Sequence, residues 1–252
     1  STPLYSSAAS DVYKRQGGTD VTTRMMMLRA RRALKQDMVI VNKKGGGGAA
    51  ALEYYKTVAA DGYTILTFTV GHAAVMAKGQ GGMKIEELRP IARGTDDPQI
   101  LMTKCGSYAS AEDFVAKQKE AGITYGVTHL GNIDDVSAFM FAKKGGMKTP
   151  KMLPFDGGAE LATQLVAGAV DAGVLNLVEA SAQIEAGEIC PTVVLADARM
   201  AAIGDVPTAK ELGIPVSFST VRGFAVHADT PPAIAEKIES ALLKAMNHTC
   251  LL

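Results

Sequence analysis

The sequence predicts an α/β fold built as two successive lobes. Strand-like and helix-like segments alternate from Gly17 to Met246, which is typical of a parallel or mixed sheet with helices on its faces. The 26 glycines among 252 residues, with no tryptophan, suit many tight turns between strands and helices. The alternation forms two sets of similar size, divided near residues 103–110, and a late strand returns to the first set. A single sheet is the alternative, but two lobes fit this rhythm better.

The first set is predicted to contain two helices and four strands. The helices span 19–36 and 49–60, and the strands span 38–42, 63–70, 89–94 and 99–104. The four glycines 45–48 form the turn into the second helix, and Gly71-His72 closes the strand 63–70.

The second set alternates in the same way. Its helices are predicted over 110–122, 134–144, 157–170 and 179–187, and its strands over 123–127, 151–155, 171–177 and 192–197. Ser110 with Asp113 three positions later predicts a capping box in which Asp replaces Glu. A strand over 222–228 and a helix over 233–247, opened by Pro231-Pro232, end the pattern.

Composition excludes several classes of partner. The 26 basic and 26 acidic residues give no net charge, so neither a nucleic acid nor a membrane surface is expected to bind. No apolar run is long enough to span a membrane. Cys105, Cys190 and Cys250 lack metal-like spacing; we interpret them as small buried hydrophobic residues that say little about redox compartment.

Two loops have the features of anion sites. Gly17-Gly18-Thr19-Asp20 opens a predicted helix, where glycines allow close backbone approach and free N–H groups favour an anion. Such a charge gains about 0.3–1 kcal/mol when exposed. The alternative, that Thr19 or Asp20 is only a helix cap, stays open.

The second loop runs from Thr128 to Asp135 and also connects a strand to a helix, through a hydroxyl, an amide and a glycine. Two such helix starts, one in each set, suggest a ligand held between them. Asp134 and Asp135 complicate this hypothesis. They either stabilise the first helical turn or bind an ammonium group, which would make the ligand an amino acid.

Catalysis has little support in the sequence. The stretch "KKGGGGAAA" (43–51) lacks the Gly-Lys-Ser/Thr of a phosphate loop, and no acidic residue follows near 68–70 to bind a ribose. Tight strand–helix packing explains these glycines better, and a dinucleotide-binding oxidoreductase is the alternative function. His72 and His129 follow strands and could donate to a ligand carboxylate. Neither a catalytic triad nor a metal-binding spacing is present.

Several stretches together resemble one family. They are "GGTDVTTR", "VIVNKKGGGGAAA", "DGYTIL", "FDGGAELATQLVAGAVDAGVLNL", "IEAGEI" and the segment from "DVPTAKELG" to "ALLKAM". These resemble the Bug proteins, the extracytoplasmic receptors of tripartite tricarboxylate transporters, in the right order over nearly all of Gly17–Met246. The resemblance implies a two-lobed periplasmic-binding-protein fold (type II). Lobe 1 would comprise 17–103 and 222–249, and lobe 2 would comprise 104–221, with hinges near Thr103–Lys104 and Val221–Gly223.

The resemblance also implies a function without catalysis, cofactor or metal. The protein would be a periplasmic monomer that captures a small carboxylate, an organic acid or acidic amino acid, between its lobes and delivers it to membrane permease subunits. The ligand-binding residues would be Gly18, Thr19, Asp20, Thr69, Gly71, His72, Thr128, His129, Gly131, Asn132, Asp135 and Asn176. The loop "NIDD" departs from the small and hydroxyl residues that are commoner there, which leaves the ligand class open.

The N-terminal residues depart from the family pattern. Family members carry a secretion signal and an apolar strand before the Gly-Gly, whereas this chain has "DVYKRQ". The codons GAT GTG TAT AAG AGA CAG spell this stretch and resemble the transposase end sequence of sequencing libraries. The closing "CLL" fits the opposite strand of the same adapter. We therefore expect residues 1–16 to be adapter-derived, the first strand to be missing and Cys250 to be non-native, so the missing signal peptide does not argue against export.

Overall fold

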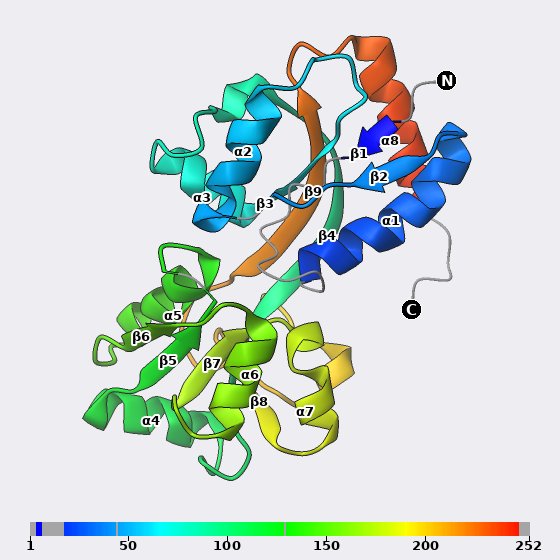
Figure 1. Cartoon of the computed structure of the whole chain (residues 1–252). Coiled ribbons are helices and arrows are strands. Elements are labelled where there is room, and N and C mark those ends of the chain that lie inside the picture. The colour runs from blue at the N-terminus through cyan, green and yellow to red at the C-terminus, as the bar shows by residue number, and fades with distance from the viewer. Residues whose placement is uncertain (1–3, 7–17, 44, 129, 247–252) are drawn as a thin grey trace. The chain divides into compact units, whose positions relative to one another are not determined.

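The computed structural model describes residues 4–6, 18–43, 45–128 and 130–246 (Figure 1). The chain divides into two compact units. Unit 1 comprises Ser1–Asp96 and Val221–Leu252, and unit 2 comprises Asp97–Thr220. The dividing lines fall within strand β4 (Leu88–Lys104) and strand β9 (Ser219–His227), so these two strands carry the chain from one unit to the other. No helix in the described ranges is long and apolar enough to cross a lipid bilayer.

Unit 1 contains a sheet in which β9 lies between β3 and β4. Its helices are α1 (Gly18–Leu34), α2 (Ala49–Lys56), α3 (Val70–Ala77) and α8 (Pro232–Met246), and its other strands are β1 (Leu4–Ser6), β2 (Met38–Ile40) and β3 (Leu66–Thr69). Short 3-10 helices, η1 (Gly46–Gly48) and η2 (Ile85–Glu87), precede α2 and β4. β3 pairs antiparallel with β9, so that Thr69 lies opposite Arg222.

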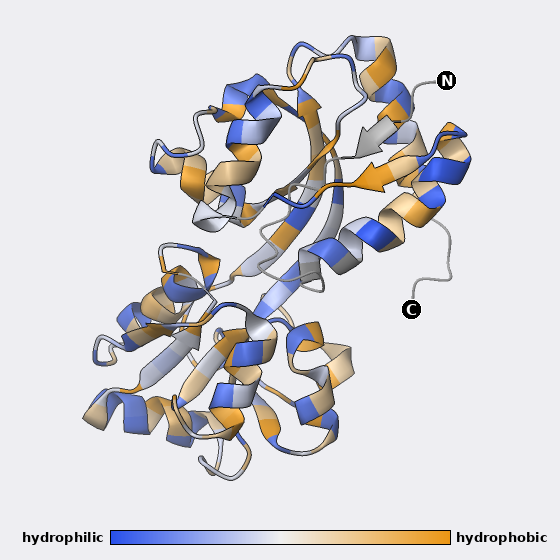
Figure 2. Ribbon diagram, in the orientation of Figure 1, coloured by the Kyte–Doolittle hydropathy of each residue, from blue (hydrophilic) through white to orange (hydrophobic). Residues whose placement is uncertain are grey.

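Alternating residues of β9 supply two separate hydrophobic clusters in unit 1. Phe224 and Val226 pack with residues of α1 and α8, whereas Ala225 between them packs with residues of α2 and α3. This alternation follows from the pleat, which directs successive side chains to opposite faces of a sheet. Helices α1 and α8 contact each other, and both carry hydrophilic and hydrophobic residues along their lengths (Figure 2). One face of the unit 1 sheet is therefore covered by α1 and α8, and the other by α2 and α3.

Unit 2 repeats the same architecture. Its helices are α4 (Ala111–Ala121), α5 (Ile133–Lys144), α6 (Gly158–Val166) and α7 (Ser181–Glu185), with 3-10 helices η3 (Leu177–Glu179) and η4 (Ala201–Ile203). Its strands are β5 (Thr124–Val127), β6 (Lys151–Pro154), β7 (Ala172–Leu175) and β8 (Ile189–Leu195), with the second part of β4. β5 is parallel to β6 and β7, while β4 pairs antiparallel with β7 and β8.

The core of unit 2 also has two faces. Leu101 of β4 packs with Phe114 and Phe141, whereas its neighbours Ile100 and Met102 pack with residues of α6. Gly126 of β5 lets Leu161 of α6 pack directly against the backbone of the strand, because a Cβ on Gly126 would lie 2.0 Å from Leu161 Cδ1.

Most predicted elements are present, with three differences. Residues 89–94 and 99–104 were predicted as separate strands, but β4 runs through both, with β9, β7 and β8 as its hydrogen-bonded neighbours. Gly71-His72, predicted to close a strand, lies in the first turn of α3, a helix that the sequence analysis missed. A short strand, Leu4–Ser6, does precede α1 and pairs parallel with β2. It falls in the stretch assigned to adapter sequence, and that assignment stays a prediction.

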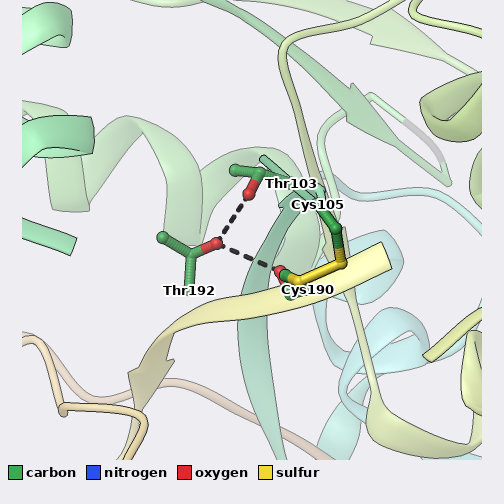
Figure 3. Close-up of a disulfide and its surroundings, with 4 residues drawn as sticks. All are labelled: Thr103, Cys105, Cys190 and Thr192. Carbon is green, nitrogen blue, oxygen red and sulfur yellow. Dashed lines mark hydrogen bonds between the residues drawn. A yellow bond between two sulfur atoms is a disulfide. The ribbon is translucent and has the colours of Figure 1, made fainter. Parts of the chain in front are cut away.

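The interpretation of the cysteines as buried hydrophobic residues is wrong for two of them. Cys105 and Cys190 form a disulfide, with an S–S distance of 2.00 Å (Figure 3). Cys190 is exposed and Cys105 half-buried. The bond joins the end of β4 to β8, beside a buried hydrogen bond between the hydroxyls of Thr103 and Thr192 (2.9 Å). Sequence spacing missed the pair because 85 residues separate the two cysteines. Cys250 lies outside the described residues.

Candidate functional site

The start of α1 is tied to the sheet of unit 1 by a chain of hydroxyl groups. The Thr23 hydroxyl donates to the Thr19 carbonyl oxygen (2.7 Å), and its Oγ1 lies 3.1 Å from Oγ1 of Thr67 on β3. Thr23 and Thr67 are buried, while Thr19 is partly exposed. The first turn of α1, with Gly18 and Thr19, is therefore fixed beside the end of β3.

Asp20 has structural partners in this turn. Its carboxylate is 3% exposed and accepts from Arg24 Nε (2.7 Å), Arg24 Nη2 (3.0 Å) and Asn42 Nδ2 (3.1 Å). The hydrogen bond from Arg24 to Asp20, and then their Coulomb attraction, raise the pKa of Arg24. Asp20 thus connects α1 to the segment after β2 and places a negative charge at a helix N-terminus, where it is favourable.

The junction between β3 and α3 holds the next predicted residues. The Thr69 N–H donates to Nδ1 of His72 (3.1 Å), so this nitrogen must be an acceptor, and the Thr69 hydroxyl, 3.0 Å away, donates to it as well. His72 is fully buried and stacks on Phe68. The imidazole therefore holds Thr69 and the start of α3 in place, beside Gly71.

Arg222 was not among the predicted site residues. It lies on β9 opposite Thr69, is only 4% exposed, and donates through Nε to Oγ1 of Thr19 at 3.4 Å. It thus links β9 to the start of α1. The alternation of β9 could have suggested Arg222, because it is a cation in register with the buried positions Phe224 and Val226.

The start of α5 is organised by Asp134. This carboxylate is 6% exposed and accepts from the N–H and hydroxyl of Thr128 and from Nε2 of Gln99 on β4. The Gln99 amide also donates to the hydroxyl of Thr220, which begins the return of the chain to unit 1. Asp134 therefore anchors the Thr128 loop to the strands that leave unit 2.

Asp135 closes the same loop from the other side. Its oxygens accept the N–H groups of Gly131 (2.7 Å) and Asn132 (2.8 Å), and the Asn132 side chain accepts the N–H of Ile133 (2.7 Å). This is a capping box at the N-terminus of α5. The open choice for Asp134 and Asp135 is thus resolved in part, because both stabilise the first turn of this helix.

Asn176 follows β7 and is 3% exposed. Its Nδ2 donates to the carbonyl oxygens of Asp97 and Pro98, both at 3.1 Å, where β4 enters unit 2. Because β5 and β7 are parallel neighbours, Asn176 and Thr128 follow strands that end at the same edge of the sheet.

Within each unit, the structure brings predicted site residues together. In unit 1 these residues are Gly18, Thr19, Asp20, Thr69, Gly71 and His72. In unit 2 they are Thr128, Gly131, Asn132, Asp135 and Asn176. His129 lies outside the described residues.

The glycine run 45–48 has a conformational explanation. All four glycines have positive φ angles, of 130°, 59°, 62° and 107°. Residues other than glycine rarely adopt positive φ angles. The conformation of the turn into α2 therefore explains the glycines, and no bound nucleotide is needed to account for them. Among the described residues, no group of three or more His, Cys, Asp or Glu side chains is placed to hold a metal ion.

Comparison with known proteins decides the family. The family model described as "Tripartite tricarboxylate transporter family receptor" (TctC) matches residues 22–251. The chain belongs to this receptor family. A relative of this receptor, a UPF0065 protein of Agrobacterium vitis, is 27% identical over 192 residues, which cover 74% of this chain and 55% of that protein. The chain spans little more than half the length of the curated relatives it matches.

Solved structures similar to the receptor show the same fold. A TctC solute-binding protein from Polaromonas, without ligand, has a TM-score of 0.79 at 27% identity, covering 98% of this chain and 85% of that one. An R. palustris protein solved with adipate has a TM-score of 0.85 at 25% identity, covering 95% of this chain and 82% of that one. The receptor therefore has the type II periplasmic-binding-protein fold that the resemblance implied.

Proposed function

We propose that the protein is a solute-binding receptor that captures a small carboxylate for a tripartite tricarboxylate-type transporter. It makes and breaks no covalent bond, and it delivers its ligand to membrane permease subunits. The family match supports the receptor role, and the related protein solved with adipate supports a carboxylate ligand. The ligand-binding residues are those at the starts of α1, α3 and α5, with Asn176.

One structural observation carries the ligand chemistry. The partly exposed Thr19 stands at the N-terminus of the 17-residue helix α1, and the buried guanidinium of Arg222 lies beside its hydroxyl. Helix N–H groups, hydroxyls and a guanidinium are all hydrogen-bond donors, and the dipole of a helix favours negative charge at this end. A small anion is the ligand that such a set favours.

Calorimetric titration of the full chain tests the proposal. The panel contains adipate and other mono- and dicarboxylates, acidic amino acids, and NAD as the probe of the oxidoreductase alternative. We expect micromolar binding of at least one carboxylate and no heat with NAD. Binding of NAD with no response to any acid would overturn the proposal.

We propose a periplasmic location, and the disulfide supports it. Disulfides persist in the bacterial periplasm and are rare in the cytosol, where thiols are kept reduced. The Cys105–Cys190 bond therefore fits an exported protein. Maleimide labelling of denatured protein recovered from each compartment checks this: both thiols should be blocked to labelling in periplasmic protein and become available after reduction. Recovery of a reduced, ligand-binding protein only from the cytosol would contradict it.

A further inference from the structure

Arg222 is a charged side chain in an apolar position. It shares its face of β9 with Phe224 and Val226, which pack into the cluster formed with α1 and α8. Only 4% of Arg222 is exposed. Burying a cation carries a large desolvation cost, which is offset only by well-placed hydrogen-bond acceptors or by an anion. Its position therefore calls for a role that an apolar residue could not fill.

The groups around Arg222 come from three elements of unit 1. Its Nε donates to Oγ1 of Thr19, at the start of α1, over 3.4 Å. Thr69 of β3 lies directly opposite in the antiparallel ladder, so the two side chains share one face of the sheet, where Cβ atoms are about 5 Å apart. His72 fixes the Thr69 hydroxyl by accepting its hydrogen. The guanidinium thus stands beside two hydroxyls that are held in place.

We propose that Arg222 is a ligand-binding residue that holds a carboxylate of the ligand, together with Thr19 and the first N–H groups of α1. This inference rests on the proposed function and assigns the carboxylate to unit 1. A guanidinium has five N–H donors in a planar fork that matches the two oxygens of a carboxylate. The dipole of α1 acts in the same direction as this charge.

The chemistry of unit 2 supports this assignment. The N–H groups of Thr128, Gly131 and Asn132 already donate to the carboxylates of Asp134 and Asp135. A second carboxylate at the start of α5 would meet two negative charges, whereas one beside Arg222 meets a positive charge. The two helix starts therefore differ in their charge balance: at the start of α1, Asp20 is paired with Arg24 and Arg222 adds a positive charge, whereas the start of α5 carries Asp134 and Asp135.

The test compares adipate with its monoamide on the full chain by calorimetry, in the unaltered protein and in Arg222→Gln. We expect Arg222→Gln to weaken adipate binding by about 10- to 100-fold, as loss of a charge-assisted pair does. We expect the unaltered protein to prefer adipate to the monoamide, and this preference to shrink severalfold in the variant. Arg93→Gln is the matched control, because it removes an exposed positive charge of unit 1 that pairs with Asp96 on the surface. It should leave both affinities unchanged.

Arg222→Lys keeps the inference testable if Arg222→Gln fails to fold, which circular dichroism would reveal. Lysine retains the charge without the fork, so we expect weaker adipate binding but a retained preference for adipate over the monoamide. Equal adipate affinity in the unaltered protein and in Arg222→Gln would overturn the role of Arg222 alone. Loss of the preference in a folded Arg222→Lys would do the same. If the unaltered protein binds no carboxylate at all, the proposed function itself fails.

Discussion

The helix starts α1 and α5 share a sequence pattern but differ in electrostatics. Each has a glycine and a hydroxyl residue near its start, and each carries an aspartate in its first turn. In unit 1, Asp20 turns toward Arg24 and Asn42, and the cation Arg222 lies beside Thr19. In unit 2, Asp134 and Asp135 turn back onto the loop and accept its N–H groups.

This difference shows that a strand–turn–helix motif does not by itself define an anion site. An acidic side chain in the first turn can bind the same N–H groups that would otherwise bind a ligand. The outcome depends on where that side chain points, and tertiary partners such as Asn42 and Gln99 determine the direction. Four sets of substitutions sharpen the comparison between the two units.

The largest effect is expected from the disulfide, which only unit 2 has among the described residues. Replacing Cys105 and Cys190 by serine should destabilise unit 2 by about 2–5 kcal/mol, because the bond closes a long loop in the unfolded chain. The expected reading is a fall in the unfolding free energy, measured by urea titration, with faster amide exchange in β4 and β8. Helices α1 and α8 of unit 1 should exchange as before.

Reductant provides the control for this prediction. Dithiothreitol should lower the melting temperature of the unaltered protein by several degrees and leave the double-serine variant unchanged. An equal response of both proteins would show that the reductant acts elsewhere. Unchanged stability of the variant would show that the bond adds nothing to unit 2.

Asp134→Asn is expected to have the next largest effect. In asparagine an NH2 group, which cannot accept a hydrogen bond, replaces one of the two carboxylate oxygens that accept from Thr128 and Gln99. At least one buried donor therefore loses its acceptor, which should lower the unfolding free energy by about 2–3 kcal/mol. Asp135→Asn should cost only about 1 kcal/mol, because this residue is partly exposed and water can satisfy its N–H partners. Urea unfolding of both variants measures the difference. A larger loss for Asp135→Asn would reverse the roles assigned to the two carboxylates.

The hydroxyl pair of unit 1 predicts a smaller and asymmetric effect. The Thr23 hydroxyl gives its hydrogen to Thr19 O, so the Thr67 hydroxyl must be the donor to Thr23. Thr23→Val leaves that buried donor unsatisfied and should cost about 1–2 kcal/mol, whereas Thr67→Val should cost less than about 1 kcal/mol. The double variant should be less destabilised than the two single losses combined, and thermal melts of all three check this. Strict additivity would exclude the bond between them.

The sequence predicted the order of the elements because apolar periodicity and capping residues act locally. Ser110 is an example, since its side chain accepts the N–H of Asp113 as the capping pattern predicted. Helix α3 was missed because it begins directly at the end of β3, without a polar segment between them. The family match confirms the predicted family, and the similar solved structures confirm the predicted fold class.

The parts of the site that the sequence did not predict depend on long-range contacts. Arg222 meets Thr19 across 203 positions, and Gln99 meets Thr220 across 121. Neither pair has a local signal, because strand pairing brings them together. The same reason explains the disulfide. Residue type and spacing therefore identified the loops, while the partners that set their charge required the structure.

Arg24→Gln should have the smallest effect and tests whether Asp20 is held by charge or by position. The ion pair is half exposed on the arginine side, with 51% of that side chain accessible, so its loss should cost about 0.2–1 kcal/mol. Salt screens such pairs, so the difference from the unaltered protein should shrink between low and high ionic strength. Asn42 still donates to Asp20 and keeps α1 in place. Urea unfolding at two salt concentrations measures this, and a loss above about 2 kcal/mol that salt does not reduce would mean that Arg24, and not Asn42, fixes the start of α1.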